Sequence, residues 1–213
     1  MRALQLPGRM SRSTEECLTS ILDMVDGIAK ALSTMELLDK PFALFGHSMG
    51  ALVVYELARK LAQDNGVKPF VLIVSACRPP HMSVGGLGPS VSQLPRDEFV
   101  DHLVSLGGMP AELRDQREIL DFFLPSIRAD YVALECYQPN LEGAPLACPV
   151  VCLGGAEDSA AIRADLAQWA NLTTQEFRLR TFEGGHFFLK DQGQAPVLKY
   201  LSELLVSQCH ALR

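Results

Sequence analysis

The sequence predicts an α/β fold, a mostly parallel sheet flanked by helices. Short apolar runs alternate with segments of helical periodicity along most of the 213 residues. Hydrophobic residues make up 48% of the chain and charged residues 21%, which is typical of a folded globular protein. This length suits a single domain over residues 1–213, with a helical insertion at about residues 83–137.

In the first half, apolar runs indicate the strands, and start or stop signals indicate the helices. Ser13–Glu16 has the pattern of a capping box, and Asn65-Gly66 that of a helix stop. Phe70–Ser75 is apolar and rich in β-branched residues, as in a strand buried on both faces. In order, we expect a strand at Ala3–Leu6, a helix after the capping box, a strand at Phe42–Phe45, a tight turn at Gly46–Gly50, a helix at Ala51–Gln63 and a strand at Phe70–Ser75.

The middle of the chain interrupts this alternation. Residues 78–95 are rich in Gly, Pro and Ser, a loop composition, and two helical stretches follow. The natural interpretation is an inserted helical lid, although core packing alone would also explain its apolar residues. The expected elements from here on are helices near residues 99–106 and 118–137, a strand at Val150–Leu153, a helix near Ala160–Trp169, a strand at Phe177–Phe182 and a helix at Pro196–Val206.

Charge and cysteine usage exclude several classes of partner. The net charge of −6 and the pI of about 5.4 argue against a nucleic acid partner, which requires a basic face. The six cysteines form no C-x-x-C pair and have no zinc-finger spacing, so we expect reduced thiols, no metal and a cytoplasmic protein. Neither a signal peptide nor an apolar run of membrane-spanning length is present, so no membrane is expected.

The strongest motif is Gly46-His47-Ser48-Met49-Gly50. It lies between a predicted strand and a predicted helix, where the α/β-hydrolase fold has its nucleophile elbow. Glycines two residues before and after the serine leave room for a strained turn, and the helix N-terminus favours negative charge. Ser48 is therefore the candidate nucleophile, and the backbone N–H of Met49 is the candidate oxyanion donor. The alternative is a Gly-rich turn without a catalytic role.

A serine nucleophile needs a base and an acid that orients it. His186 follows a predicted strand, is flanked by glycines, and has the chain order nucleophile, acid, histidine. The acid should follow the strand at Val150–Leu153, where Glu157 and Asp158 are adjacent. We favour Asp158, because a shorter carboxylate at a turn can fix the imidazole tautomer. The alternatives are a surface-loop role for His186 and a helix N-cap role for Asp158.

Five segments together resemble the type II thioesterase family, which includes medium-chain thioesterases of fatty acid synthase. They are Leu6–Arg9, Phe45–Gly50, Ile127–Tyr131, Gly154–Asp158 and Gly184–Phe188. The resemblance implies hydrolysis of acyl groups from the phosphopantetheine thiol of an acyl or peptidyl carrier protein, through an acyl-Ser48 intermediate. Such proteins serve fatty acid, polyketide or nonribosomal peptide synthases. The resemblance also implies a lid over the acyl pocket, no cofactor and a monomer.

Members of that family carry an earlier strand and a Gly-rich loop before the segment that matches Leu6–Arg9. We therefore expect a shortened form with this first family strand missing, and expect a longer product to be the competent enzyme. Two other functions remain open from the sequence. One is a carboxylesterase of the same fold, and the other is a non-catalytic carrier-binding relic. Arg9, Arg59 and Lys60 are cationic residues that could meet an acidic carrier, although scattered surface charge is the commoner explanation.

Overall fold

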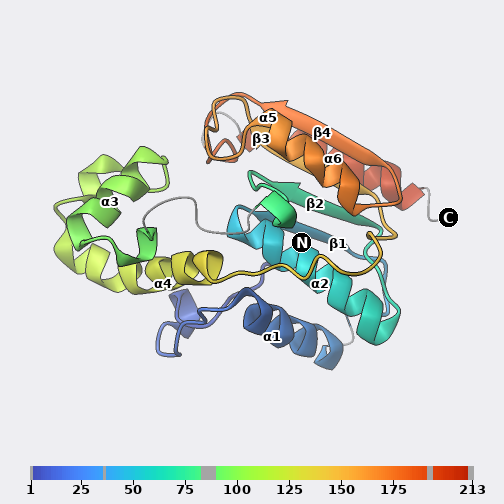
Figure 1. Cartoon of the computed structure of the whole chain (residues 1–213), viewed down its shortest axis with the longest axis horizontal. Coiled ribbons are helices and arrows are strands. Elements are labelled where there is room, and N and C mark those ends of the chain that lie inside the picture. Colours follow the sequence, from blue (N-terminus) through green and yellow to red (C-terminus); the bar gives the residue numbers. More distant parts are fainter. Residues whose placement is uncertain (1, 36, 83–89, 191–193, 211–213) are drawn as a thin grey trace.

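A parallel sheet forms the frame of the molecule (Figure 1). The computed structural model describes residues 2–35, 37–82, 90–190 and 194–210. All strands in the described sheet are parallel and follow the chain order β1-β2-β3-β4, which confirms the predicted class. The strands are β1 (Ala43–His47), β2 (Val71–Ser75), β3 (Val150–Gly155) and β4 (Phe177–Phe182). The helices are α1 (Ile21–Thr34), α2 (Met49–Asn65), α3 (Arg96–Ser105), α4 (Arg117–Glu135), the single turn α5 (Arg163–Leu166) and α6 (Gln194–His210).

Each face of the sheet has its own core. Successive strand side chains point to opposite faces, so Leu72 and Val74 pack with α1 and α2, whereas Ile73 packs with α6. Every residue of β2 and β3 is buried, as expected for strands covered on both faces. Helix α2 ends at Gly66, whose left-handed φ of 66° confirms the predicted stop.

Two predictions at the start of the chain are wrong. The segment Ala3–Leu6 is not a strand; most of its residues are exposed, and no neighbouring described segment pairs with it. A strand needs such a partner for its backbone groups. Helix α1 begins at Ile21 rather than after Ser13–Glu16, because the side chain of Ser20 accepts a hydrogen bond from the Asp23 N–H at 3.2 Å and caps the helix.

The helix predicted near Ala160–Trp169 is also only partly correct. Regular helix is confined to α5, and residues 167–172 tighten into 3-10 turns. The turns bring the fully buried Trp169 into the core, where its Nε1–H donates to the Cys77 carbonyl at 2.8 Å. A buried indole N–H needs such a partner, and this requirement is not visible in helical periodicity.

Helices α3 and α4 lie together beside one end of the sheet, on the left of Figure 1. They come between β2 and β3 in the chain and enclose a small core of their own, which includes Phe99, Leu103 and Leu120. The predicted start of this insertion, residue 83, lies outside the described residues, which resume at residue 90. We call residues 90–137 the lid segment; that it covers a substrate stays a prediction.

An ion pair joins the lid segment to the start of the chain. Both guanidinium nitrogens Nη1 and Nη2 of Arg9 donate to the Asp130 carboxylate at 2.8 Å, and each side chain is only 22% exposed. The pKa of Arg9 lies above its ordinary value because its hydrogen bond to Asp130 outweighs the effect of burial. Asp130 lies on α4 and holds this helix against the loop at residues 7–12.

Replacing Asp130 by Asn should destabilise the protein by about 1–3 kcal/mol, because a half-buried Arg9 loses its counter-ion and one of its two acceptors. The free energy of unfolding in urea measures this. Glu15→Gln is the matched control, since it breaks the similar but exposed Arg12–Glu15 pair and should cause no measurable change. Equal effects of the two substitutions would contradict the structural role of Arg9–Asp130.

Candidate active site

Ser48 occupies a strained turn between β1 and α2. Its φ of 54° and ψ of −126° are unusual for a residue with a side chain, and cost on the order of 1–3 kcal/mol. A Cβ on Gly46 would lie 2.0 Å from the Gly50 carbonyl oxygen, so glycine is required where the strand passes under the helix. The Ser48 N–H donates to the Ser75 carbonyl of β2 at 2.8 Å. The turn therefore fixes the hydroxyl at the carboxyl edge of the sheet.

The structure brings the three candidate residues together. Ser48 Oγ lies 3.0 Å from His186 Nε2, and His186 Nδ1 lies 2.9 Å from Asp158 Oδ2. An ionised carboxylate only accepts hydrogen bonds, so Nδ1 donates to Asp158 and Nε2 is free to accept from the serine hydroxyl. The Asp158 and His186 side chains are 1% and 11% exposed. This arrangement can remove a proton from Ser48 when the hydroxyl attacks an acyl carbon.

Asp158, and not Glu157, faces His186. Glu157 is exposed, whereas the second oxygen of Asp158 accepts from the Ala160 N–H at 3.0 Å. Burial alone would raise the pKa of Asp158, but the hydrogen bond and charge of His186 and the N–H groups of Ala160 and Ala161 outweigh it and lower the pKa below its ordinary value. Asp158 does not cap α5, whose N-cap residue is Ile162.

Backbone contacts fix the two loops that carry Asp158 and His186. The Ala156 N–H donates to the Phe182 carbonyl at 2.8 Å, and the Glu157 N–H donates to the Gly184 carbonyl at 3.0 Å. A Cβ on Gly155 would lie 2.2 Å from the Gly185 carbonyl oxygen, so the loops approach each other as closely as glycine permits. The distance between acid and base thus depends on main-chain geometry rather than on flexible side chains.

Met49 is the first residue of α2, directly after Ser48. An N–H in the first turn of a helix has no carbonyl four residues earlier to bind, and the helix dipole places partial positive charge there. The position suits an oxyanion donor, and that role of Met49 stays a prediction.

His47 and Ser75 form a buried pair beside the three candidate residues, which the sequence did not predict. His47 Nδ1 lies 3.0 Å from the hydroxyl of the fully buried Ser75, and its ring centroid lies 5.3 Å from that of His186. Burial, and next the charge of His186, lower the pKa of His47 to about 4, so that this ring is neutral at physiological pH. The pairing of two residues 28 positions apart had no local sequence signal.

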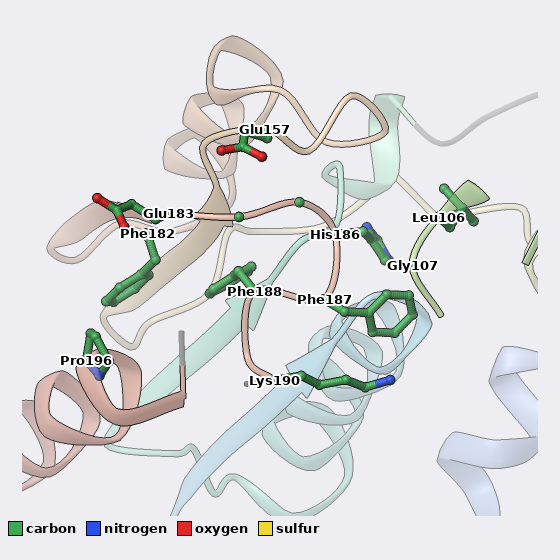
Figure 2. A pocket seen from close by; sticks show the side chains of 12 residues that line it. Leu106, Gly107, Glu157, Phe182, Glu183, His186, Phe187, Phe188, Lys190 and Pro196 are labelled. Carbon is green, nitrogen blue, oxygen red and sulfur yellow. The ribbon is translucent and has the colours of Figure 1, made fainter. Parts of the chain in front are cut away.

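An open cleft of about 810 Å³ runs along the loop that carries His186. Figure 2 shows His186 and Phe187 at one end, opposite Leu106 and Gly107 of the lid segment, and Pro196 of α6 at the other end. The cleft therefore connects the candidate base to the outside between the lid segment and the sheet.

Two further titratable side chains outside the three candidate residues have structural partners. Asp165 pairs with Arg78 at 2.8 Å, and His102 on α3 contacts the Tyr131 hydroxyl at 3.0 Å. All six cysteines are free thiols. In the described ranges, no three His, Cys, Asp or Glu side chains are grouped to hold a metal ion. Over the same ranges no helix combines the length and apolar character needed to cross a bilayer.

Comparison with known proteins gives consistent matches along the chain. The family model described as a thioesterase domain matches residues 1–205. The protein named linear gramicidin dehydrogenase LgrE, from Brevibacillus parabrevis, is 38% identical over 207 residues, which are 96% of this chain and 76% of that protein. The medium-chain S-acyl fatty acid synthase thioesterase of Homo sapiens is 32% identical over 93% of this chain and 74% of its own length.

A solved structure agrees in fold. The RedJ thioesterase from the prodiginine biosynthetic pathway in Streptomyces coelicolor superposes with a TM-score of 0.84 at 33% identity, covering 93% of this chain and 72% of that one. The similarity therefore spans most of this chain.

The low pKa of His47 predicts a pH-dependent stability. The ordinary pKa of histidine is about 6.5, so between pH 6.5 and 4 the unfolded chain binds a proton at His47 that the folded protein excludes, and stability falls as the pH falls. The free energy of unfolding in urea should therefore drop by about 2–3 kcal/mol more between pH 7 and pH 4.5 in the parent than in His47→Asn. If the free energies of unfolding of the two proteins changed in parallel with pH, the conclusion that His47 is buried and neutral would be wrong.

Proposed function

The chain belongs to the thioesterase domain family, and on that premise we propose that Ser48, His186 and Asp158 hydrolyse acyl thioesters carried on the phosphopantetheine arm of a carrier protein. The observation that carries the proposal is the continuous hydrogen-bonded chain from Ser48 Oγ through His186 to Asp158, with His186 lining the cleft. This arrangement suits thioester hydrolysis. The thiol is a good leaving group, so only the serine needs strong activation.

The first proposed step forms the acyl-enzyme. His186 Nε2 takes the proton of Ser48 as Oγ attacks the thioester carbonyl, and Asp158 stabilises the resulting imidazolium. The developing oxyanion is stabilised by the Met49 N–H and the N-terminus of α2. The carbon–sulfur bond then breaks, the pantetheine thiolate takes the proton from His186, and the acyl group stays on Ser48.

The second proposed step releases the acid. Water enters along the cleft, gives a proton to His186 Nε2, and attacks the ester carbonyl of acyl-Ser48. The tetrahedral intermediate collapses, Ser48 Oγ takes back the proton, and the free carboxylic acid leaves. The two steps need neither a metal ion nor a bound cofactor, because every proton moves between the substrate, water and the three side chains.

The three cationic residues considered for contact with a carrier protein each have an acidic or carbonyl partner. Arg9 binds Asp130, and Lys60 binds Asp26 and Asp64. Arg59 donates to carbonyl oxygens in the segment that follows α4. These charges therefore do not support a carrier surface, and the carrier function rests on the family instead.

The lid segment supports an acyl-binding role under this proposal. Its own core of Phe99, Leu120 and neighbouring residues makes it a packed unit, and Leu106 and Gly107 at its tip line the cleft next to His186. An acyl chain attached to Ser48 would run between this unit and the sheet. The free state of all six thiols supports a reducing compartment, the cytoplasm, for an enzyme that we propose acts as a monomer.

A fluorophosphonate probe, which reacts with activated serines, tests the nucleophile. The parent should be labelled at Ser48, Ser48→Ala should not be labelled, and Asp158→Asn should label roughly 10³–10⁴-fold more slowly because the imidazole loses its tautomer lock. Ser13→Ala, at an exposed serine, should behave as the parent. Absence of labelling in the parent, with retained binding of an acyl-carrier protein, would favour the carrier-binding relic.

Substrate comparison separates a thioesterase from a carboxylesterase. The same acyl group is presented as a carrier-protein thioester, as a free pantetheine thioester and as a p-nitrophenyl ester. We expect kcat/KM to be at least roughly tenfold higher for the carrier thioester, because binding of the arm and carrier contributes to the transition state. Highest turnover of the p-nitrophenyl ester would identify a carboxylesterase.

A further inference from the structure

The lid segment approaches the loop of His186 at the aromatic ring of Phe187. A Cβ on Gly108, which follows α3, would lie 2.9 Å from Phe187 Cε2 and 3.1 Å from Cζ. The backbone of the lid tip therefore touches the edge of the Phe187 ring as closely as glycine allows. Figure 2 shows this ring pointing towards the lid tip at Gly107, next to His186.

The same ring also belongs to the candidate active site. The centroid of Phe187 lies 5.0 Å from that of His186, edge to face, and 5.6 Å from that of His47. The ammonium group of Lys190 lies 4.5 Å from the ring centroid. One side chain thus contacts the lid tip and both histidines of the site.

The neighbouring phenylalanine fixes the other end of this loop. Phe188 is buried, stacks on Phe182 with 5.6 Å between ring centroids, and lies in the core shared with α6. Two phenylalanine rings follow His186 in the chain. The ring of Phe188 lies in the core of the body, and the ring of Phe187 points towards the lid tip. Because Phe188 is fixed in this core, Phe187 is the ring of the pair that can respond to the lid tip.

On the basis of the proposed function, we propose that Phe187 is a positioning residue through which contact with the lid tip at Gly108 sets the orientation of the His186 imidazole. With the tip seated, Phe187 is held between Gly108 and the two histidines, and His186 Nε2 stays 3.0 Å from Ser48 Oγ. With the tip raised, the ring loses one of its two supports and the imidazole gains freedom to rotate. Proton transfer is thereby linked to lid closure over the acyl group.

Two substitutions break this contact from opposite sides. Gly108→Ala places a methyl group against the ring, and the φ of Gly108 is one that alanine adopts without strain. Phe187→Leu removes the ring edge but keeps an apolar side chain. Because Phe187 is partly exposed, the second variant should fold even if the first is destabilised. Gly27→Ala in α1, where nothing lies within 4 Å of the new methyl, is the matched control.

The measurement is a double-mutant cycle on fluorophosphonate labelling, with the maximal rate of labelling resolved from the half-saturating probe concentration. Each single variant should lower the maximal rate about tenfold, since small displacements of a base cost this much or more. The half-saturating probe concentration should change less than twofold. In the Phe187→Leu background, Gly108→Ala should have less than a twofold further effect, because the ring that transmits it is gone.

Each other result overturns the inference. Equal effects of Gly108→Ala in both backgrounds would mean that the lid tip acts independently of Phe187. A change confined to the half-saturating probe concentration would mean that the lid tip only controls access to the site. A maximal labelling rate of Phe187→Leu equal to that of the parent would mean that the ring does not position His186. Failure of the proposed function gives a distinct outcome. If Ser48 is not a nucleophile, neither the parent nor Gly27→Ala is labelled, and if the enzyme is a carboxylesterase, labelling persists but the p-nitrophenyl ester is the best substrate.

Discussion

The hydrogen bond from the Ser48 N–H to the Ser75 carbonyl is the contact on which the site depends. It ties a turn of positive φ to the end of β2, and the Ser75 hydroxyl holds the ring of His47 at the same point. The next residue, Ala76, also has a positive φ of 48°, so both strands end in strained backbone. Strain of this kind persists only where the surrounding structure determines it. Here the fully buried β2 supplies that support.

The acid and the base are held with the same main-chain precision. Asp158 and His186 follow neighbouring parallel strands, and hydrogen bonds between their loops fix the separation that the sheet register sets. The lid segment has its own core, and its C-terminal end also packs into the core of the body through Ala133 and Tyr137. Arg9–Asp130 and the contact of Gly108 with Phe187 join the two parts at other points. The loops of Asp158 and His186 are thus fixed to each other by main-chain hydrogen bonds, whereas these contacts of the lid segment with the body involve side chains.

Sequence reasoning succeeded where the signal is local. Gly46 reports a close backbone approach within the turn, and Gly66 reports a left-handed helix stop. The expectation that Gly50 also leaves needed room is wrong, because nothing lies within 4 Å of a Cβ built there. Sequence reasoning also failed where two local patterns compete, as when Ser20 rather than Ser13 capped α1. The contacts of Arg9 with Asp130 and of Gly108 with Phe187 join distant parts of the chain. Periodicity contains no information about such pairs. The fold and the triad could therefore be predicted from the sequence, whereas the contacts that join the lid segment to the rest of the protein could not.

The electrostatics of the site follow from which groups are charged before attack. Asp158 is ionised despite its burial, because His186 and two backbone N–H groups stabilise the carboxylate. His47 is neutral, since burial next to His186 makes a second positive charge costly. In the proposed proton transfer from Ser48, the positive charge that appears on His186 therefore meets a fixed carboxylate on one side and an uncharged ring on the other. A charged His47 would oppose that step by repulsion at about 5 Å in a partly buried site, so its neutrality favours proton transfer as well as stability.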